Sequence, residues 1–348
     1  MKKIILLFVI SLALVSCKKD PAIPPPVTGN TLPFENTTLK LDLVNSSLPL
    51  SVREIYFINK SNGIITTYDN KIFITADEGA NWTLQYSFPD PPANRSNGQL
   101  TQILFTSTKI GYVVGDFYPC TGDIPCGTRS GIVLKTSDGG ATWTKVFSNP
   151  QSFSAIAVNG SGDLYALAKG VLKSADGGLN WTSIDSTVIA RTGLIFNNGY
   201  GFCNGYLDKI YRSADNGASW ILLSSPTSNY LGDLKFFEEY GFCIGDYSQS
   251  VYKTTDHGNT WEKSHESNFR YSVVNLLSNE NCLLFGDGSY SGGDFGIYHG
   301  AVCQTTNSGD SWTETEFVDL QSIRCSSFYS ASEGYCVANR KLIKVTVK

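Results

Sequence analysis

Short apolar segments separated by turns rich in Gly, Asn and Asp run along the chain from residue 37 to its end. Runs of this length, bounded by turn residues, predict β-strands rather than helices. Two kinds recur. One is an apolar strand ending near Phe, such as Ile55–Phe57 and Ile103–Phe105, and the other is a Gly-aromatic strand, such as Gly111–Val114 and Gly201–Cys203. The pattern therefore predicts an all-β domain built from repeats.

A third recurring unit, which we call the box, reads Ser/Thr-x-Asp/Asn-x-Gly-x-Asn/Thr/Ser-Trp, and all six tryptophans of the chain end one. Each box lies between two predicted strands, so we interpret it as a hairpin turn. Its Gly can adopt positive φ, its Asp or Asn can accept backbone hydrogen bonds, and its Trp can cover the turn. The alternative, a Ca²⁺ or sugar site, lacks the several oxygen ligands of a calcium loop. The structural pairs are Asp77 and Trp82, Asp138 and Trp143, Asp176 and Trp181, Asp215 and Trp220, Asp256 and Trp261, and Asn307 and Trp312.

The order of these units gives four strands per repeat, which is typical of a propeller blade. Six complete repeats run to about residue 317, and a seventh begins at Ile323–Cys325 and ends at Leu342–Val345 without a box or a fourth strand. Leu39–Leu43 is a strand without a blade of its own, and it can supply the missing outer strand. We therefore predict a seven-bladed β-propeller over residues 37–348, with six blades and a separate tail as the alternative.

The box resembles the Asp-box, or BNR, repeat of sialidases, sortilin-type receptors, some endoglucanases and Ycf48-like photosystem II assembly factors. The short box-to-box periods and the Gly-aromatic strand are most similar to the Ycf48-like branch. That branch implies a non-enzymatic binding or assembly module, but the families share no single activity. The Arg-Ile-Pro motif of sialidases is absent from this sequence, and endoglucanase-type propellers pair two domains. We therefore expect no enzyme activity, with a glycoside hydrolase as the alternative.

The N-terminal residues 1–16 have the pattern of a secretory signal, because the charged Met1–Lys3 precede the apolar run Ile4–Val15. The run is short for a transmembrane helix. Leu14–Cys17 resembles a bacterial lipobox, which implies that Cys17 is acylated, and sorting rules for such proteins favour the outer membrane. The proline-rich residues 17–36 predict an extended tether.

The formal net charge is −4, and no cluster of Lys and Arg is present. This composition argues against a nucleic-acid partner. We expect an exported monomer without a cofactor that binds a protein or glycan partner in the cell envelope.

The eight cysteines that follow Cys17 fall into three groups. Cys120 and Cys126 flank a short polar segment of an exported chain, which predicts a disulfide. A second group shares one repeat position that Val113 fills elsewhere, which predicts buried core thiols; it comprises Cys203, Cys243, Cys282 and Cys336. Cys303 and Cys325 have no assignment. The three histidines are scattered along the sequence, so we expect no metal site.

The tryptophan spacings are 61, 38, 39, 41 and 51, so two repeats are expanded. Both insertions, Asp116–Gly131 and Gly286–Gly300, connect a second to a third strand, which places them on the face opposite the boxes. Loops on a rigid scaffold commonly carry function, and tyrosines with carboxylates can bind sugars or peptides. A polar surface loop without a ligand is the alternative. The candidate binding residues are Asp116, Tyr118, Asp123, Arg129, Asp287, Tyr290, Asp294, Tyr298 and His299.

Four arginines lie near the starts of first strands, which line the central channel of a propeller. Arg53 and Arg324 share one repeat position, and Arg191 and Arg270 lie one or two positions from it. They are candidates for a positive channel mouth suited to a carboxylate. The alternative is that they pair with the loop aspartates, which would add little stability at exposed positions.

Overall fold

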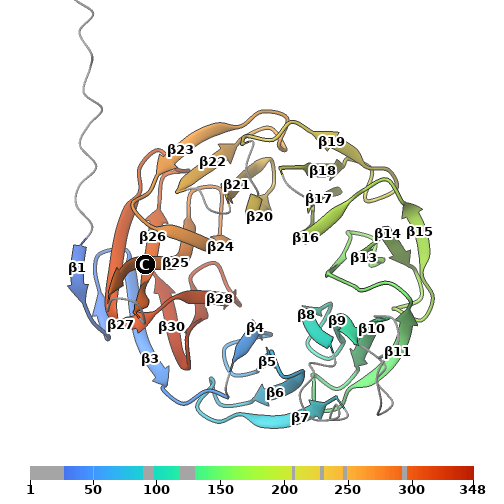
Figure 1. Cartoon of the computed structure of the whole chain (residues 1–348), viewed down its shortest axis with the longest axis horizontal. Helices are drawn as coiled ribbons and strands as arrows, with labels where there is room; N and C mark the ends of the chain where they lie inside the picture. The colour runs from blue at the N-terminus through green and yellow to red at the C-terminus, as the bar shows by residue number, and fades with distance from the viewer. Residues whose placement is uncertain are drawn as a thin grey trace, which may run out of the picture.

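The computed structural model describes residues 27–49, 51–88, 98–117, 130–205, 208–227, 231–245, 249–291 and 296–348. These residues form seven sheets that surround a central opening (Figure 1). The predicted seven-bladed β-propeller is confirmed, and the alternative of six blades with a separate tail is wrong. Within the described ranges, no helix has the length and apolar character needed to cross a membrane.

Blades one to six follow the chain, and each runs from an inner strand at the channel to an outer strand at the rim. Blades one and two contain β4 (Val52–Phe57), β5 (Gly63–Thr67), β6 (Lys71–Thr75) and β7 (Thr83–Ser87), then β8 (Gly98–Phe105), β9 (Gly111–Phe117), β10 (Ser130–Thr136) and β11 (Thr144–Asn149). Blades three and four contain β12 (Ala155–Val158), β13 (Leu164–Ala168), β14 (Gly170–Ser174) and β15 (Thr182–Asp185), then β16 (Ala190–Asn197), β17 (Tyr200–Gly205), β18 (Ile210–Ser213) and β19 (Ile221–Leu223). Blades five and six contain β20 (Leu231–Phe237), β21 (Tyr240–Gly245), β22 (Ser250–Thr254) and β23 (Glu262–Glu266), then β24 (Arg270–Leu276), β25 (Cys282–Ser291), β26 (Ile297–Thr305) and β27 (Thr313–Gln321).

Blade seven is completed by the N-terminal part of the chain, as predicted. Its inner three strands are β28 (Ile323–Phe328), β29 (Glu333–Ala338) and β30 (Lys341–Val347), and its fourth is β3 (Leu39–Asn45). β3 runs antiparallel to β30, and Leu41 lies opposite Val345. The pairing links the two ends of the chain within blade seven through backbone hydrogen bonds, so the edge of β30 is not left open.

Two further N-terminal strands lie inside the range expected to be a tether. β2 (Phe34–Glu35) pairs with β3, and β1 (Val27–Asn30) pairs in parallel with β27 as a fifth strand of blade six. The proline-rich composition of residues 17–36 concealed these strands. The part of the expected tether that follows residue 26 therefore belongs in part to the propeller.

The two recurring strand motifs pack against each other between blades. The Phe57 ring lies 3.9 Å, centroid to centroid, from the Tyr335 ring of the Gly-aromatic strand of blade seven. The Phe236 ring likewise lies 3.5 Å from that of Phe202. The motif requires glycine for a steric reason, because a Cβ at Gly111 would lie 2.6 Å from the Phe105 ring of its own blade. The motifs are therefore the contact surfaces that hold neighbouring blades together.

The six cysteines that the structure describes are unpaired and buried. The prediction of core thiols is confirmed for Cys203, Cys243, Cys282 and Cys336, each of which has no exposed surface. The predicted Cys120–Cys126 disulfide and the predicted acylation site Cys17 lie outside the described residues.

Candidate functional site

The six boxes form hairpin turns between third and fourth strands, with their polar groups hydrogen-bonded inside the turn. In the second box, Asp138 Oδ1 accepts hydrogen bonds from the Thr142 N–H at 2.9 Å and the Thr136 hydroxyl at 2.7 Å. The Thr142 and Thr136 hydrogen bonds lower the pKa of Asp138 to about 2. The Gly140 φ is +98°, as the turn prediction requires. Because the Asp138 oxygens are used within the turn, this residue serves as a staple.

The sixth box keeps the same geometry although Asn307 replaces Asp. Asn307 Oδ1 accepts from the Ser311 N–H at 3.0 Å, and its Nδ2 donates to the Ser311 hydroxyl at 2.9 Å. The Trp312 Nε1–H donates to the Gly309 carbonyl at 3.2 Å. The amide thus fulfils the role of the carboxylate without a charge.

The opposite face carries the second-to-third-strand connections and the starts of the first strands. On this face, the predicted loop Gly286–Gly300 is largely a hairpin, because β25 continues to Ser291 and β26 begins at Ile297. The loop prediction is therefore wrong over most of that range, since both arms continue the sheet. Asp116, at the equivalent place in blade two, lies in β9 and is buried, as is Asp287 in β25. Four other candidates lie outside the described residues, namely Tyr118, Asp123, Arg129 and Asp294.

The blade-six hairpin presents aromatic and aliphatic side chains to solvent. Tyr290 and Tyr298 face each other across the two strands, with ring centroids 5.0 Å apart. They are 47% and 40% exposed, and the neighbouring Ile297 is 42% exposed. The Gly296 N–H donates to the Tyr290 hydroxyl at 2.9 Å, which fixes one ring. Three large side chains at adjacent positions are thus held in contact with water.

A chain of polar contacts between β25, β26 and β27 supports this hairpin. His299 Nε2 lies 2.9 Å from the Ser291 hydroxyl, and His299 Nδ1 lies 3.5 Å from Glu316 Oε1. The same Oε1 accepts the Ser289 N–H. The arrangement has the order of a Ser-His-Glu triad, but the His–Glu distance exceeds that of a hydrogen bond. We therefore interpret these residues as a support that orients the hairpin.

The arginines at the first-strand starts divide between pairing and exposure. Arg324 Nη2 lies 3.3 Å from Asp287 Oδ2, although the Arg324 side chain is 59% exposed. The Arg53 guanidinium lies 5.2 Å from the centre of the Tyr68 ring. Arg270 is exposed and lies opposite Asp287 in the sheet. The contact of Arg324 with Asp287 agrees with the alternative prediction, that these arginines pair with the loop aspartates. Arg53 instead makes a cation–π contact with Tyr68, a residue that the sequence did not single out. The side chain of Arg191 lies outside the described part of the chain.

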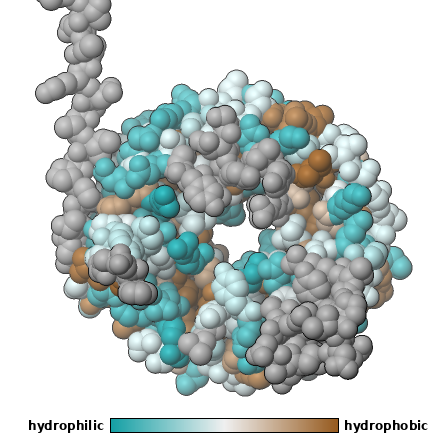
Figure 2. Space-filling view, viewed as in Figure 1, coloured by the Kyte–Doolittle hydropathy of each residue, from teal (hydrophilic) through white to brown (hydrophobic). Residues whose placement is uncertain are grey.

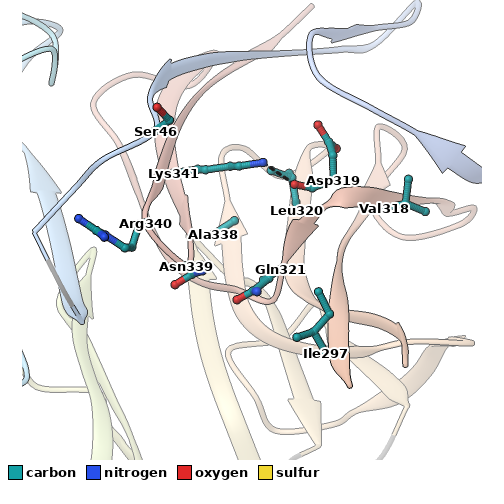
Figure 3. Close-up of a pocket in the computed structure, with 10 residues that line it drawn as sticks. All are labelled: Ser46, Ile297, Val318, Asp319, Leu320, Gln321, Ala338, Asn339, Arg340 and Lys341. Atoms are coloured by element: carbon teal, nitrogen blue, oxygen red, sulfur yellow. Dashed lines mark hydrogen bonds between the residues drawn. The ribbon is translucent and has the colours of Figure 1, made fainter. Parts of the chain in front are cut away.

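Two shallow pockets adjoin the hairpin and share Ile297, Gln321 and Asn339 in their walls. One has a volume of about 310 Å³ and includes Tyr298 and Arg324. The other, of about 320 Å³, lies between the outer part of blade six and the β29–β30 turn of blade seven (Figure 3). In it the Lys341 ammonium donates to the Asp319 carbonyl. We call the surface formed by Tyr290, Ile297, Tyr298 and Arg324 the channel-mouth surface.

Inner strands contribute polar side chains that bridge neighbouring blades at the channel wall. Glu54 Oε2 accepts the Ile103 N–H at 2.8 Å, and Gln102 Oε1 accepts the Ile156 N–H at 2.8 Å. Burial raises the pKa of Glu54 to about 8, although the Ile103 N–H opposes this shift. The sequence pattern did not indicate a role for Glu54, because only the arginines near the starts of the first strands were candidates for the channel mouth. Figure 2 shows the channel open at the centre of the ring, with hydrophilic residues at several places along the coloured part of its rim.

No protein-family model matches the chain, and no curated protein matches it. Solved structures do share its fold. YCF48 bound to D1 peptide superposes with a TM-score of 0.66 at 15% identity over 90% of this chain and 99% of that one. YCF48 from Cyanidioschyzon merolae gives 0.64 at 13% identity over 87% and 98%. The GH74 xyloglucanase from Xanthomonas campestris gives 0.63 at 11% identity, over 87% of this chain but only 53% of the enzyme. At these identities the similarity shows the propeller fold alone.

Proposed function

We propose that this chain is an exported, non-enzymatic binding module that holds a protein partner on its channel-mouth surface. The observation that carries the proposal is the exposed cluster of Tyr290, Ile297 and Tyr298 beside Arg324. Tyrosine and arginine are enriched among the residues that dominate binding energy in protein interfaces. The pairing of β25 with β26 and the Gly296–Tyr290 hydrogen bond orient these side chains before binding, which lowers the ordering entropy lost on association.

The partner is best described as an extended segment that carries carboxylates. Arg324 is mostly exposed despite its contact with Asp287, so its remaining donors can reach a ligand. Arg53 and the exposed Arg270 lie on the same face, at the starts of inner strands. Arginine binds carboxylates through two parallel hydrogen bonds. The likeness to a YCF48 structure with a bound peptide supports a peptide ligand for a propeller of this shape.

The setting of this activity is proposed from the sequence. Acylation of Cys17 would attach the chain to a bacterial membrane, in agreement with the lipobox-like segment Leu14–Cys17. The linker between Cys17 and β1 would let the propeller reach a partner in the envelope while the chain stays membrane-bound. The protein would act as a monomer, with no nucleic-acid partner.

Site-specific photocrosslinking in cells tests this proposal. A photoreactive phenylalanine analogue replaces Tyr298 on the channel-mouth surface and, in a matched control, Leu222, which is 55% exposed on the outer strand of blade four. We expect a defined protein adduct from position 298 and none of the same mass from position 222. Identical adducts from both positions, or adducts to glycan alone at position 298, would overturn the assignment of a protein partner.

One observation favours glycoside hydrolysis as a second candidate function. Glu54, at the channel wall, has a pKa raised by burial to about 8, which suits a general acid. The propeller also resembles about half of the GH74 xyloglucanase. Release of reducing ends from xyloglucan by the wild-type chain, lost in Glu54→Gln, would support hydrolysis. We expect no release, because Glu54 Oε2 is occupied by the Ile103 N–H.

A further inference from the structure

Three side chains of types that coordinate metals converge between blades five and six. His265 lies in β23, Cys303 in β26 and Glu314 in β27. Their ligand atoms all lie within 4.8 Å of one another. We propose that His265, Cys303 and Glu314 bind one divalent cation of the zinc class. The scattered sequence positions had predicted no metal site, because adjacency across two blades cannot be read from spacing.

The distances suit tetrahedral coordination. Zinc binds imidazole nitrogen and carboxylate oxygen at about 2.0–2.2 Å and thiolate sulfur at about 2.3 Å. Those bond lengths place the nitrogen and the oxygen about 3.4 Å apart, and the sulfur about 3.6 Å from either. His265 Nε2 lies 3.3 Å from Glu314 Oε1. Because the ligand atoms lie within 4.8 Å of one another, the Cys303 sulfur has to approach the other two by about 1.2 Å at most.

Comparison with the other blades shows that the cluster departs from the repeat. Cys303 stands two residues before the first residue of its box, where the other repeats carry large side chains: Phe73, Leu134, Leu172, Tyr211 and Tyr252. Glu314 stands two residues after the box Trp. The five equivalents of Glu314 are exposed, whereas its own side chain is 7% exposed. At this blade interface alone among the six repeats, a small thiol replaces a large side chain and a buried carboxylate replaces an exposed residue. Departures of this kind from a repeat pattern are typical of a binding site rather than of core packing.

The surroundings of Glu314 hold its carboxylate in one orientation. The Tyr271 hydroxyl donates to Oε1 at 3.1 Å, the Asn268 amide donates to Oε2 at 3.1 Å, and the Ser267 hydroxyl also donates to Oε1. The His265 ring lies nearly parallel to the indole of Trp312, with centroids 5.8 Å apart. Hydrogen bonds and contacts of this kind commonly orient metal ligands. Glu314 and His265 are therefore positioned before a cation arrives, and only the Cys303 side chain has to move.

Charge balance favours occupation by a divalent cation. On binding, the Cys303 thiol loses its proton to solvent and its sulfur forms the bond to the metal. The thiolate and the Glu314 carboxylate together carry two negative charges, which the dication neutralises while His265 remains neutral. A buried site with no net charge avoids the large desolvation cost of an unpaired ion. Mixed nitrogen, oxygen and sulfur donors favour zinc over magnesium or calcium.

Cobalt substitution tests the site directly. The full-length chain is stripped with a chelator, titrated with Co²⁺ and then with Zn²⁺, and followed by absorption spectroscopy. We expect one equivalent of Co²⁺ to bind, with a thiolate-to-cobalt charge-transfer band and the visible bands of a tetrahedral ion. Zn²⁺ should abolish both. Absence of the charge-transfer band in the wild type would show that the three residues form a hydrogen-bonded network only, and would overturn the proposal.

Variants separate this site from the other thiols. Cys303→Ser should lose the charge-transfer band, whereas Cys282→Ser, which alters another fully buried thiol of blade six, should keep it. His265→Phe preserves the ring against Trp312 and removes the ligand, so Co²⁺ affinity should fall at least tenfold. Because the His265 side chain is partly exposed, this variant provides the test of the site if Cys303→Ser does not fold. Unchanged affinity in His265→Phe, or a band that survives Cys303→Ser, would contradict the assignment.

Discussion

Replacing a box tryptophan by alanine should destabilise the propeller without altering its channel-mouth surface. Trp220 is 8% exposed, and its ring lies 6.0 Å from that of Phe196 in an edge-to-face arrangement. Its Nε1–H donates to the Gly217 carbonyl at 3.2 Å. The Trp220→Ala change therefore removes both a large apolar body and a hydrogen bond from the fourth blade.

The expected cost follows from burial. A buried tryptophan removes about 150–250 Å² from water, which at about 25 cal/mol per Å² corresponds to about 4–6 kcal/mol. Alanine recovers part of this area, and measured Trp→Ala costs in cores are about 3–5 kcal/mol. An unfolding entropy of about 2.1 cal/mol/K per residue over roughly 310 residues converts about 4 kcal/mol into a decrease in Tm of about 6 °C.

Differential scanning calorimetry of wild type, Trp220→Ala and a matched control measures the effect. The control is Leu222→Ala, two residues along the chain and 55% exposed, for which we expect a change below about 1 °C. A Tm of Trp220→Ala equal to that of wild type, or an equal loss in Leu222→Ala, would refute the interpretation of the box as a staple.

Three further predictions concern the turns, the closure and the proposed lipid anchor. The pKa of Asp138 is about 2 in the folded protein, below its ordinary value of 3.8, so the stabilisation by this carboxylate is present above about pH 4 and is lost as the pH falls toward 2. Asp138→Asn should therefore flatten the dependence of Tm on pH over that range, and an unchanged slope would contradict this. Leu41→Ala, at a fully buried position of β3, should cost about 2–5 kcal/mol in denaturant unfolding, whereas Leu43→Ala, at a 46% exposed position, should cost far less; equal costs would argue against closure by β3. Cys17→Ser should move the protein from the membrane to the soluble fraction, and retention in washed membranes would contradict acylation.

The repeat pattern allowed the fold to be predicted in detail, because each local signal has a direct geometric cause. A single turn requires positive φ at Gly140, and a single strand pair requires space for the Phe105 ring over Gly111. Both requirements select glycine at fixed positions of the repeat. The closure by β3 could be predicted because a strand without a blade and a blade without a strand are both visible in the sequence.

The candidate site was less accessible to sequence reasoning. Expansion of the blade-six repeat indicated where Tyr290 and Tyr298 lie, but glycine-rich composition predicted a loop where two strands extend. Contacts between residues distant in sequence, such as Arg53 with Tyr68 or His265 with Glu314, depend on how blades and turns meet in space. Polar residues in the first strands, such as Glu54, gave no periodic signal.

The affinity of the crosslinked partner for channel-mouth variants tests the central claim most directly. Tyr298→Ala and Arg324→Ala should each raise Kd at least tenfold, equivalent to about 1.4 kcal/mol, while Leu222→Ala leaves Kd unchanged. Equal Kd values for all four proteins, measured by calorimetry on folded samples, would contradict the assignment of the partner to this surface.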